Sequence, residues 1–153
     1  MKRFLYLICI LLVGTACKEV FEAPPQALLL ASFYNSTATN KAMSPRITLQ
    51  GVGFDNILYR DTIRPNMLLP LTINDTTRYI IWLDSKRDSL TFVHETTLKY
   101  ASMESGFYYE YKLRLVKFTQ NRIDSVEITD SLVTTKWNEN IKLYIHPLPA
   151  GSK

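Results

Sequence analysis

From Ala27 to Pro147 the chain alternates apolar and polar residues with a period of two, and no apolar stripe at helical spacing interrupts the pattern. β-Branched and aromatic residues are common in the alternating segments, and short polar breaks separate one segment from the next. The clearest segment is 107–118, in which one face of a strand would carry the alternate residues Tyr109, Tyr111, Leu113 and Leu115. The pattern predicts an all-β fold.

Two polar breaks indicate how neighbouring strands connect. Residues 79–83 are apolar at every position, which predicts a strand that is buried on both faces. The polar stretch 84–88 follows directly, so 77–95 should form a hairpin around that turn. A second polar break at 119–122 should turn the chain so that 123–129 returns as a strand.

The expected strands are short and numerous. A last strand places Ile141, Leu143 and Ile145 on one face and ends at Pro147, which has no N–H to continue a ladder. About eight to ten strands at this spacing predict an antiparallel β-sandwich, either immunoglobulin-like or an open-barrel variant. The segment 35–45 is either a long loop or an excursion of an edge strand, and the residues favour neither.

The first residues have the pattern of an export signal. Lys2 and Arg3 precede an apolar run over 4–13, and small residues follow that run. At about 15 Å as a helix, ten residues are too few to span a bilayer. We therefore expect residues 1–16 to be a signal peptide, 27–147 to form the one domain, and 148–153 to be a C-terminal tail.

The small residues lead directly to a cysteine. Gly14-Thr15-Ala16-Cys17 resembles a bacterial lipobox, in which cleavage occurs before a cysteine that carries lipid, although Gly14 stands where an aliphatic residue is usual. The resemblance implies lipidation of Cys17, with 17–26 as a tether and the membrane as a partner through the lipid. The alternative is an ordinary secretory signal, cleaved near Ala16, that leaves a free thiol.

The residues after the cysteine indicate which membrane holds the protein and on which side of that membrane it lies. Lys18, Glu19 and Glu22 resemble the signal that sends Bacteroidota lipoproteins across the outer membrane. The resemblance implies an outer-membrane protein on the cell surface in preference to the periplasmic face. The same residues are also what a solvated tether would contain, and Pro24-Pro25 would stiffen it.

The charge balance argues against nucleic acid as a partner. The whole chain has 18 basic and 14 acidic residues, and loss of Lys2 and Arg3 with the signal lowers the formal net charge from +4 to +2. After cleavage no basic run is longer than Lys86-Arg87. Nucleic-acid binding normally requires a larger basic patch.

The residues that carry chemistry are few. His94 and His146 are far apart in the chain, and Glu95 beside His94 should point to the opposite sheet face, so neither forms a metal site. Gly51 and Gly53 lack the third glycine and the helix of a phosphate loop. We expect no catalytic residues, no metal and no cofactor.

Most of the Asp residues begin a short recurring motif. Asp is followed by Ser or Thr and then by an aliphatic residue or Thr, which resembles the acceptor motif for O-glycosylation of exported Bacteroidota proteins. The structural alternative is turn capping by Asp, with an apolar residue opening the next strand. If the motif is modified, the acceptors are Thr62, Thr76, Ser89, Ser125 and Ser131.

Aromatic residues are the remaining material for a binding site. Trp137 lies in a polar stretch that is typical of a loop, and Tyr108 and Tyr144 occupy the more polar faces of their strands. Such rings stack on the apolar C–H faces of sugars, so the three are candidate ligand-stacking residues. Packing at the edge of the core is the alternative for each of them.

Three segments together resemble short Bacteroidota lipoproteins of unknown function: Cys17-Lys18-Glu19, 48–53 (TLQGVG) and 121–126 (NRIDSV). The resemblance implies a location and no activity. We expect a lipid-anchored, non-catalytic envelope protein that binds a ligand or partner, with a glycan preferred over another envelope protein. The alternative is a structural or assembly accessory whose sheet edges pair with an outer-membrane component.

Overall fold

The computed structural model describes residues 22–38, 41–53 and 56–148, and in these ranges it contains ten strands and no helix. One sheet has four strands in the order β4-β1-β10-β8: β4 (Asn66–Pro70), β1 (Leu28–Asn35), β10 (Glu139–Ile145) and β8 (Ile123–Ile128). The other has six in the order β3-β2-β5-β6-β7-β9: β3 (Ile57–Ile63), β2 (Arg46–Gly51), β5 (Thr76–Leu83), β6 (Lys86–Ser102), β7 (Gly106–Phe118) and β9 (Leu132–Val133).

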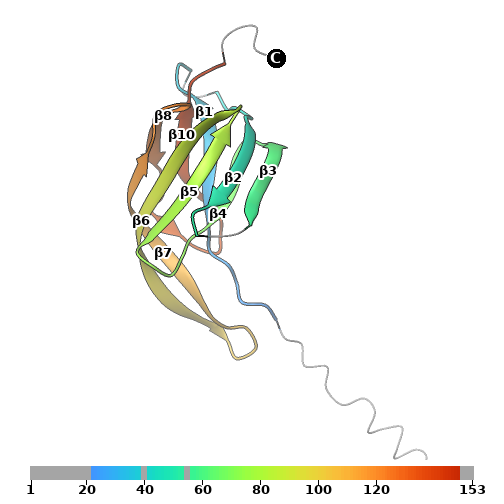
Figure 1. Cartoon of the computed structure of the whole chain (residues 1–153). Helices are drawn as coiled ribbons and strands as arrows, with labels where there is room; N and C mark the ends of the chain where they lie inside the picture. Colours follow the sequence, from blue (N-terminus) through green and yellow to red (C-terminus); the bar gives the residue numbers. More distant parts are fainter. Residues whose placement is uncertain (1–21, 39–40, 54–55, 149–153) are drawn as a thin grey trace, which may run out of the picture.

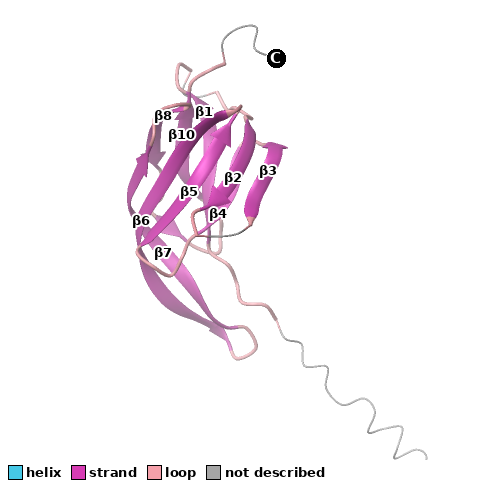
Figure 2. Cartoon of the chain, viewed as in Figure 1, coloured by secondary structure: helices cyan, strands magenta, loops and turns pink. Residues whose placement is uncertain are grey.

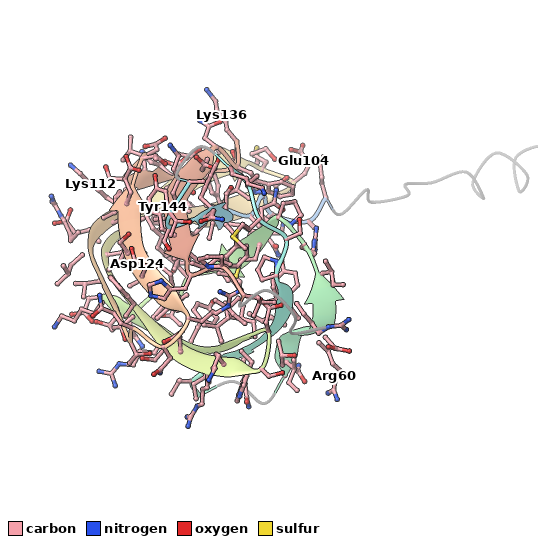
Figure 3. The ribbon with its side chains drawn as sticks, turned by 90° about the horizontal axis from the view of Figure 1, so that it is seen from above. Arg60, Glu104, Lys112, Asp124, Lys136 and Tyr144 are labelled. Carbon is pink, nitrogen blue, oxygen red and sulfur yellow. The ribbon has the colours of Figure 1, made fainter. Side chains whose placement is uncertain are left out.

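The two sheets form a sandwich in which the six-stranded sheet curls into an antiparallel half-barrel (Figures 1 and 2). This confirms the all-β fold and the expected number of strands. Among the paired strands described, only β1 and β10 run parallel. Seen from above, charged side chains such as Arg60, Lys112 and Lys136 project away from the ring of strands (Figure 3).

The core lies between the sheets and takes every second residue of the long strands. Phe33 and Leu143 of the four-stranded sheet are fully buried, as are Leu49, Ile81 and Phe92 of the six-stranded sheet. Burial of each large apolar side chain stabilises the fold by roughly 1.5–3 kcal/mol. The period-two alternation therefore decides which residues enter the core.

β5 and β6 form the expected hairpin, but with two differences. The turn consists of Asp84 and Ser85 alone, both at positive φ, as a two-residue hairpin turn requires. The expectation of a strand buried on both faces was wrong, because Ile80 and Trp82 on the outer face of β5 stay half-exposed.

A bulge in β7 corrects the face assigned to that strand. Val93 pairs with Leu115 but His94 pairs with Leu113, so Arg114 is an extra residue in β7. Because a bulge reverses the facing of every residue beyond it, Leu115 is 47% exposed, whereas Tyr111 and Leu113 are buried.

The turn after β7 leads to the other sheet. β8 pairs with β10 in the four-stranded sheet, so 123–129 does not return beside β7. The buried carboxylate of Asp88 accepts hydrogen bonds from the Thr119 hydroxyl and from the backbone N–H groups of Asn121, Arg122 and Ile123, at 2.7–3.1 Å. These bonds hold the chain where it crosses between the sheets.

The segment 35–45 is largely a loop. Among its described residues, Ala42 forms an isolated bridge with Tyr34 of β1. The predicted signal peptide and Cys17 lie outside the described residues. Within the described ranges, no helix has the length and apolar content that crossing a bilayer requires.

Candidate functional site

A groove of about 450 Å³ lies on the outer face of the six-stranded sheet, over β2, β3 and β5. Its volume is within the range of small-ligand sites. Trp82 supplies the aromatic surface, and the polar lining residues are Arg46, Thr48, Gln50, Asp61 and Ser85. This combination of one large ring and several hydrogen-bonding groups makes it the candidate binding site.

Irregularities in β3 shape this groove. Over the paired stretch seven residues of β3 (57–63) face five of β2 (46–50), so the edge strand bulges twice along its length. Asp61 adopts a φ of +48° at one bulge, and its N–H donates to the Thr48 hydroxyl at 3.1 Å. The bulge brings the Asp61 carboxylate over the outer face, where a regular edge strand would only continue the sheet.

Charged groups surround the indole ring. Arg46 donates to the Asp61 carboxylate at 3.0 Å, and both side chains are more than half exposed. In the strand register, Trp82 lies between Thr48 of β2 and Arg87 of β6. The Arg87 guanidinium lies 5.9 Å from the centre of the indole ring. Donors and acceptors therefore flank a half-buried indole ring on the outer face of the sheet.

Trp137, Tyr108 and Tyr144 do not meet at one site. Trp137 is 48% exposed, has a φ of +50°, and donates its indole N–H to the Gln26 carbonyl at 3.0 Å. Tyr108 lines a second groove, between residues 23–28 and the root of the β6–β7 hairpin.

Tyr144 lies on the outer face of the four-stranded sheet. Its ring is 6.0 Å from that of Tyr34, and its hydroxyl donates to Glu127 at 2.8 Å. That hydrogen bond, together with burial, raises the pKa of the Tyr144 hydroxyl. Each of the three aromatic candidates thus has a local packing or hydrogen-bonding partner, and stacking on a ligand remains a prediction.

The five candidate acceptors of O-glycosylation have different surroundings. Thr62 lies in the edge strand β3 and Thr76 begins β5. Ser89 is half-buried in a strand paired on both sides, whereas Ser125 is exposed on β8. Ser131 precedes β9, where the Asp130 carboxylate accepts the Leu132 N–H at 2.9 Å. Turn capping therefore accounts for Asp130, and modification remains a prediction for all five hydroxyls.

The two histidines are separate from each other. His94 is buried, with its Nε2 2.9 Å from the Thr77 hydroxyl and its ring edge-on to Tyr111. His146 is at the surface, 3.7 Å from the Asp124 carboxylate. In the part of the chain that the structure describes, no three potential metal ligands gather in one place.

The buried ring of His94 should make stability depend on pH. Burial lowers the pKa of His94, and the charge of Asp75 opposes that shift. Above the unfolded-state pKa of about 6.5 the neutral ring is fully stabilising, and this contribution falls as the pH drops toward the lower folded-state pKa. The unfolding free energy of the wild-type protein should therefore decline as the pH falls below about 6.5, and we expect His94→Gln to make that decline less steep. Urea titration at a series of pH values measures it. The surface variant His146→Gln should keep the decline, and an equal slope in all three proteins would contradict the prediction.

Sequence patterning did not identify the groove, because Trp82 lies in a run that is apolar throughout. The sequence pattern that indicates the groove is on the neighbouring strand, where every second residue is polar: Arg46, Thr48 and Gln50. Those residues face outward because Ile47 and Leu49 are buried. The outer face of the strand paired with β2 is then exposed as well, and Trp82 lies on it.

The comparisons with known proteins identify a family and no activity. The model of a family of unknown function, DUF6452, matches residues 46–145, which is the chain from the start of β2 to the end of β10. No curated protein and no solved structure matches the chain. The expectation of an uncharacterised family is confirmed, and the lipoprotein character and bacterial group remain predictions. The chain belongs to the DUF6452 family of unknown function.

Proposed function

We propose that this protein is a lipid-anchored, non-catalytic binding protein of the outer membrane, and that it binds a glycan in the groove around Trp82. The observation that carries the proposal is the half-buried indole ring of Trp82, which lines the groove together with Arg46, Asp61 and Gln50. Lipidation of Cys17 and exposure at the cell surface come from the signal pattern at the N-terminus.

The chemistry of the groove suits a sugar ring. The C–H face of a hexose is apolar and stacks on an indole, while its equatorial hydroxyls need donors and acceptors around the rim. Arg46 and Gln50 can donate, and Asp61 and Gln50 can accept. The Arg46–Asp61 pair is exposed and thus weakly held, so it can exchange its mutual hydrogen bond for bonds to a ligand.

The position of the groove also fits a ligand from outside the cell. Arg46 begins β2 and Ser85 lies in the β5–β6 turn, so the groove reaches the end of the sandwich opposite the β6–β7 hairpin (Figure 1). Residues 22–27, which continue from the expected anchor, leave at the hairpin end. A bound glycan would therefore lie on the side away from the membrane.

Replacing Trp82 by alanine should weaken glycan binding strongly. Loss of a stacked aromatic surface removes roughly 1.5–3 kcal/mol, which is about a tenfold to hundredfold loss of affinity. The measurement is binding of the purified protein to an array of hexose and amino-sugar polysaccharides, followed by titration of each polymer that binds. Trp82→Phe, which keeps a ring, should retain part of the affinity.

Trp137→Ala is the matched control, because it removes the other tryptophan and leaves the groove intact. Equal loss in Trp82→Ala and Trp137→Ala would contradict the assignment to the groove. Binding that survives Trp82→Ala but is lost in Trp137→Ala would move the site to the loop between β9 and β10.

The assembly role is the second candidate, favoured by the position of β3 at the edge of the six-stranded sheet. An edge strand offers unpaired N–H and C=O groups to a strand of another protein. The two bulges in β3 oppose this role, because they distort the ladder that a partner strand would extend. Assembly would be favoured over glycan binding if one envelope protein co-purified with this chain, if that association depended on β3, and if no glycan bound on the array.

A further inference from the structure

The β6–β7 hairpin projects beyond the sandwich. β5 pairs with β6 only as far as Val93, and β9 pairs with β7 only at Tyr111 and Lys112. From Thr97 to Glu110 the two strands therefore pair only with each other, and they form the long arm at the lower end of Figure 1. An isolated two-stranded hairpin is marginally stable in water, so an arm of this length calls for another contact.

Large apolar side chains are exposed on this arm. Leu98, Tyr100 and Phe107 are 54–59% exposed, and Met103 in the connecting turn is 90% exposed. The rings of Tyr100 and Phe107 meet edge-on at 5.3 Å across the strands. We call residues 98–107 the hairpin tip. Several large apolar side chains exposed together at the end of one arm indicate a partner that removes them from water.

The N-terminal segment leaves the sandwich at the same end as the hairpin. Residues 23–28 line a groove with Phe107, Tyr108, Tyr109 and Tyr111, so this part of the chain runs beside the arm from its root to Phe107. Trp137 contacts Gln26 at this end as well. Residues 22–27 therefore leave the sandwich at the end to which the hairpin points (Figure 1).

The length of chain before Ala27 limits how far the sandwich can lie from a lipid on Cys17. Ten Cα-to-Cα steps lead from Cys17 to Ala27, which extend to at most about 36 Å. The arm from Thr97 to Met103 extends by about 20 Å. The tip can therefore reach the bilayer surface when the tether spans less than about 20 Å, which is somewhat more than half of its full extension.

We propose that the hairpin tip inserts into the interfacial layer of the same bilayer that holds the Cys17 lipid, with Tyr100, Met103 and Phe107 as the inserted residues. The proposal rests on the lipid anchor of the proposed function and is independent of glycan binding. Tyrosine and other amphipathic rings favour the interface, and apolar faces insert there by about 5–10 Å. Glu104 and Lys99 limit the depth to the headgroup level, because their charges stay hydrated.

Insertion at two points would fix the orientation of the sandwich. A lipid on a tether alone leaves the sandwich free to rotate. A second contact through the hairpin tip holds that end of the sandwich against the membrane. The groove around Trp82 then faces away from the bilayer. The second contact therefore gives the exposed apolar arm a role in presenting the binding face.

A fluorescent label at the tip tests the proposal in the lipidated full chain. Cys9 is removed with the signal peptide and the Cys17 sulfur carries lipid, so Met103→Cys introduces the one reactive thiol of the mature protein. The protein is incorporated into phosphatidylethanolamine–phosphatidylglycerol vesicles and labelled with an environment-sensitive dye. We expect a blue shift of the emission and loss of most of its intensity when brominated lipids are included.

Lys86→Cys is the matched control, because Lys86 is exposed at the opposite end of the same strand, roughly 50 Å from the tip. Its label should show neither the shift nor the quenching. A Met103→Cys label that stays in water while the protein floats with the vesicles would overturn the proposal. The proposal would also be overturned if the label were shielded in detergent and this shielding increased with protein concentration. That result would indicate that the tip binds a second copy of the protein.

Flotation of the unlabelled protein separates this proposal from the anchor on which it rests. The wild-type chain should float with the vesicles, and Cys17→Ser should lose most of that flotation because a single hairpin tip binds a bilayer weakly. If neither protein floats, the lipid anchor is absent and both proposals fail. If both float equally, flotation does not depend on the lipid, which contradicts the anchor, and quenching of the Met103→Cys label then decides whether the tip is inserted.

Discussion

Replacing Asp88 by alanine should lower the free energy of unfolding by about 4 kcal/mol. The Asp88 carboxylate is 2% exposed and accepts hydrogen bonds from the Thr119 hydroxyl and from three consecutive backbone N–H groups at 121–123. Alanine removes all four acceptor contacts and leaves buried N–H groups without partners, and each such group costs roughly 1–3 kcal/mol. Urea denaturation followed by tryptophan fluorescence measures the loss.

Two further variants make this prediction specific. Asp88→Asn keeps the shape but replaces one acceptor oxygen by an NH₂ group that faces donors, so its loss should be about half that of alanine. Asp124→Ala removes the first residue of the same Asp-Ser-aliphatic motif at a site that is 43% exposed, and should change stability by less than about 0.5 kcal/mol. Equal losses for Asp88→Ala and Asp124→Ala would show that Asp88 does not hold the crossing between the sheets.

Replacing Asn140 by alanine should cost about 3 kcal/mol. Asn140 is 1% exposed and is the extra residue of β10 where its register with β1 shifts. Its side-chain oxygen accepts the Leu30 N–H at 3.0 Å, and its NH₂ group donates to the carbonyls of Asp130 and Leu132 at 3.1 and 2.8 Å. Alanine leaves one donor and two acceptors of the backbone without these bonds in the parallel β1–β10 region.

Hydrogen exchange gives a local measurement for the same variant. The Leu30 amide should lose its protection in Asn140→Ala, while amides in the centre of β5 keep theirs. The neighbouring exposed variant Asn138→Ala should leave both unchanged. Asn140→Asp should be at least as damaging as alanine, because a carboxylate would face two carbonyl oxygens. Full stability of Asn140→Asp at neutral pH would contradict the hydrogen-bond assignment.

Asp88 and Asn140 illustrate a general limit of the sequence reading. In the sequence, Asp88 belongs to a polar turn and to a motif that repeats with Asp61, Asp75 and Asp130. The residues that it binds lie 31–35 positions further along the chain. Local pattern distinguishes polar from apolar positions, but it does not show which polar side chain is closed over by a distant segment.

The amino-acid sequence by itself determined the all-β class, the alternating core positions such as Leu49, Ile81 and Leu143, and the end of the last strand before Pro147. Those properties follow from the period of two and from proline's missing N–H, both of which act within a few residues. The assignment of β8 to the other sheet, the bulge that turns Leu115 outward and the exposure of Trp82 were decided only by tertiary structure. Each of these depends on pairing between segments far apart in the chain, where a shift of one residue changes the face that a side chain occupies.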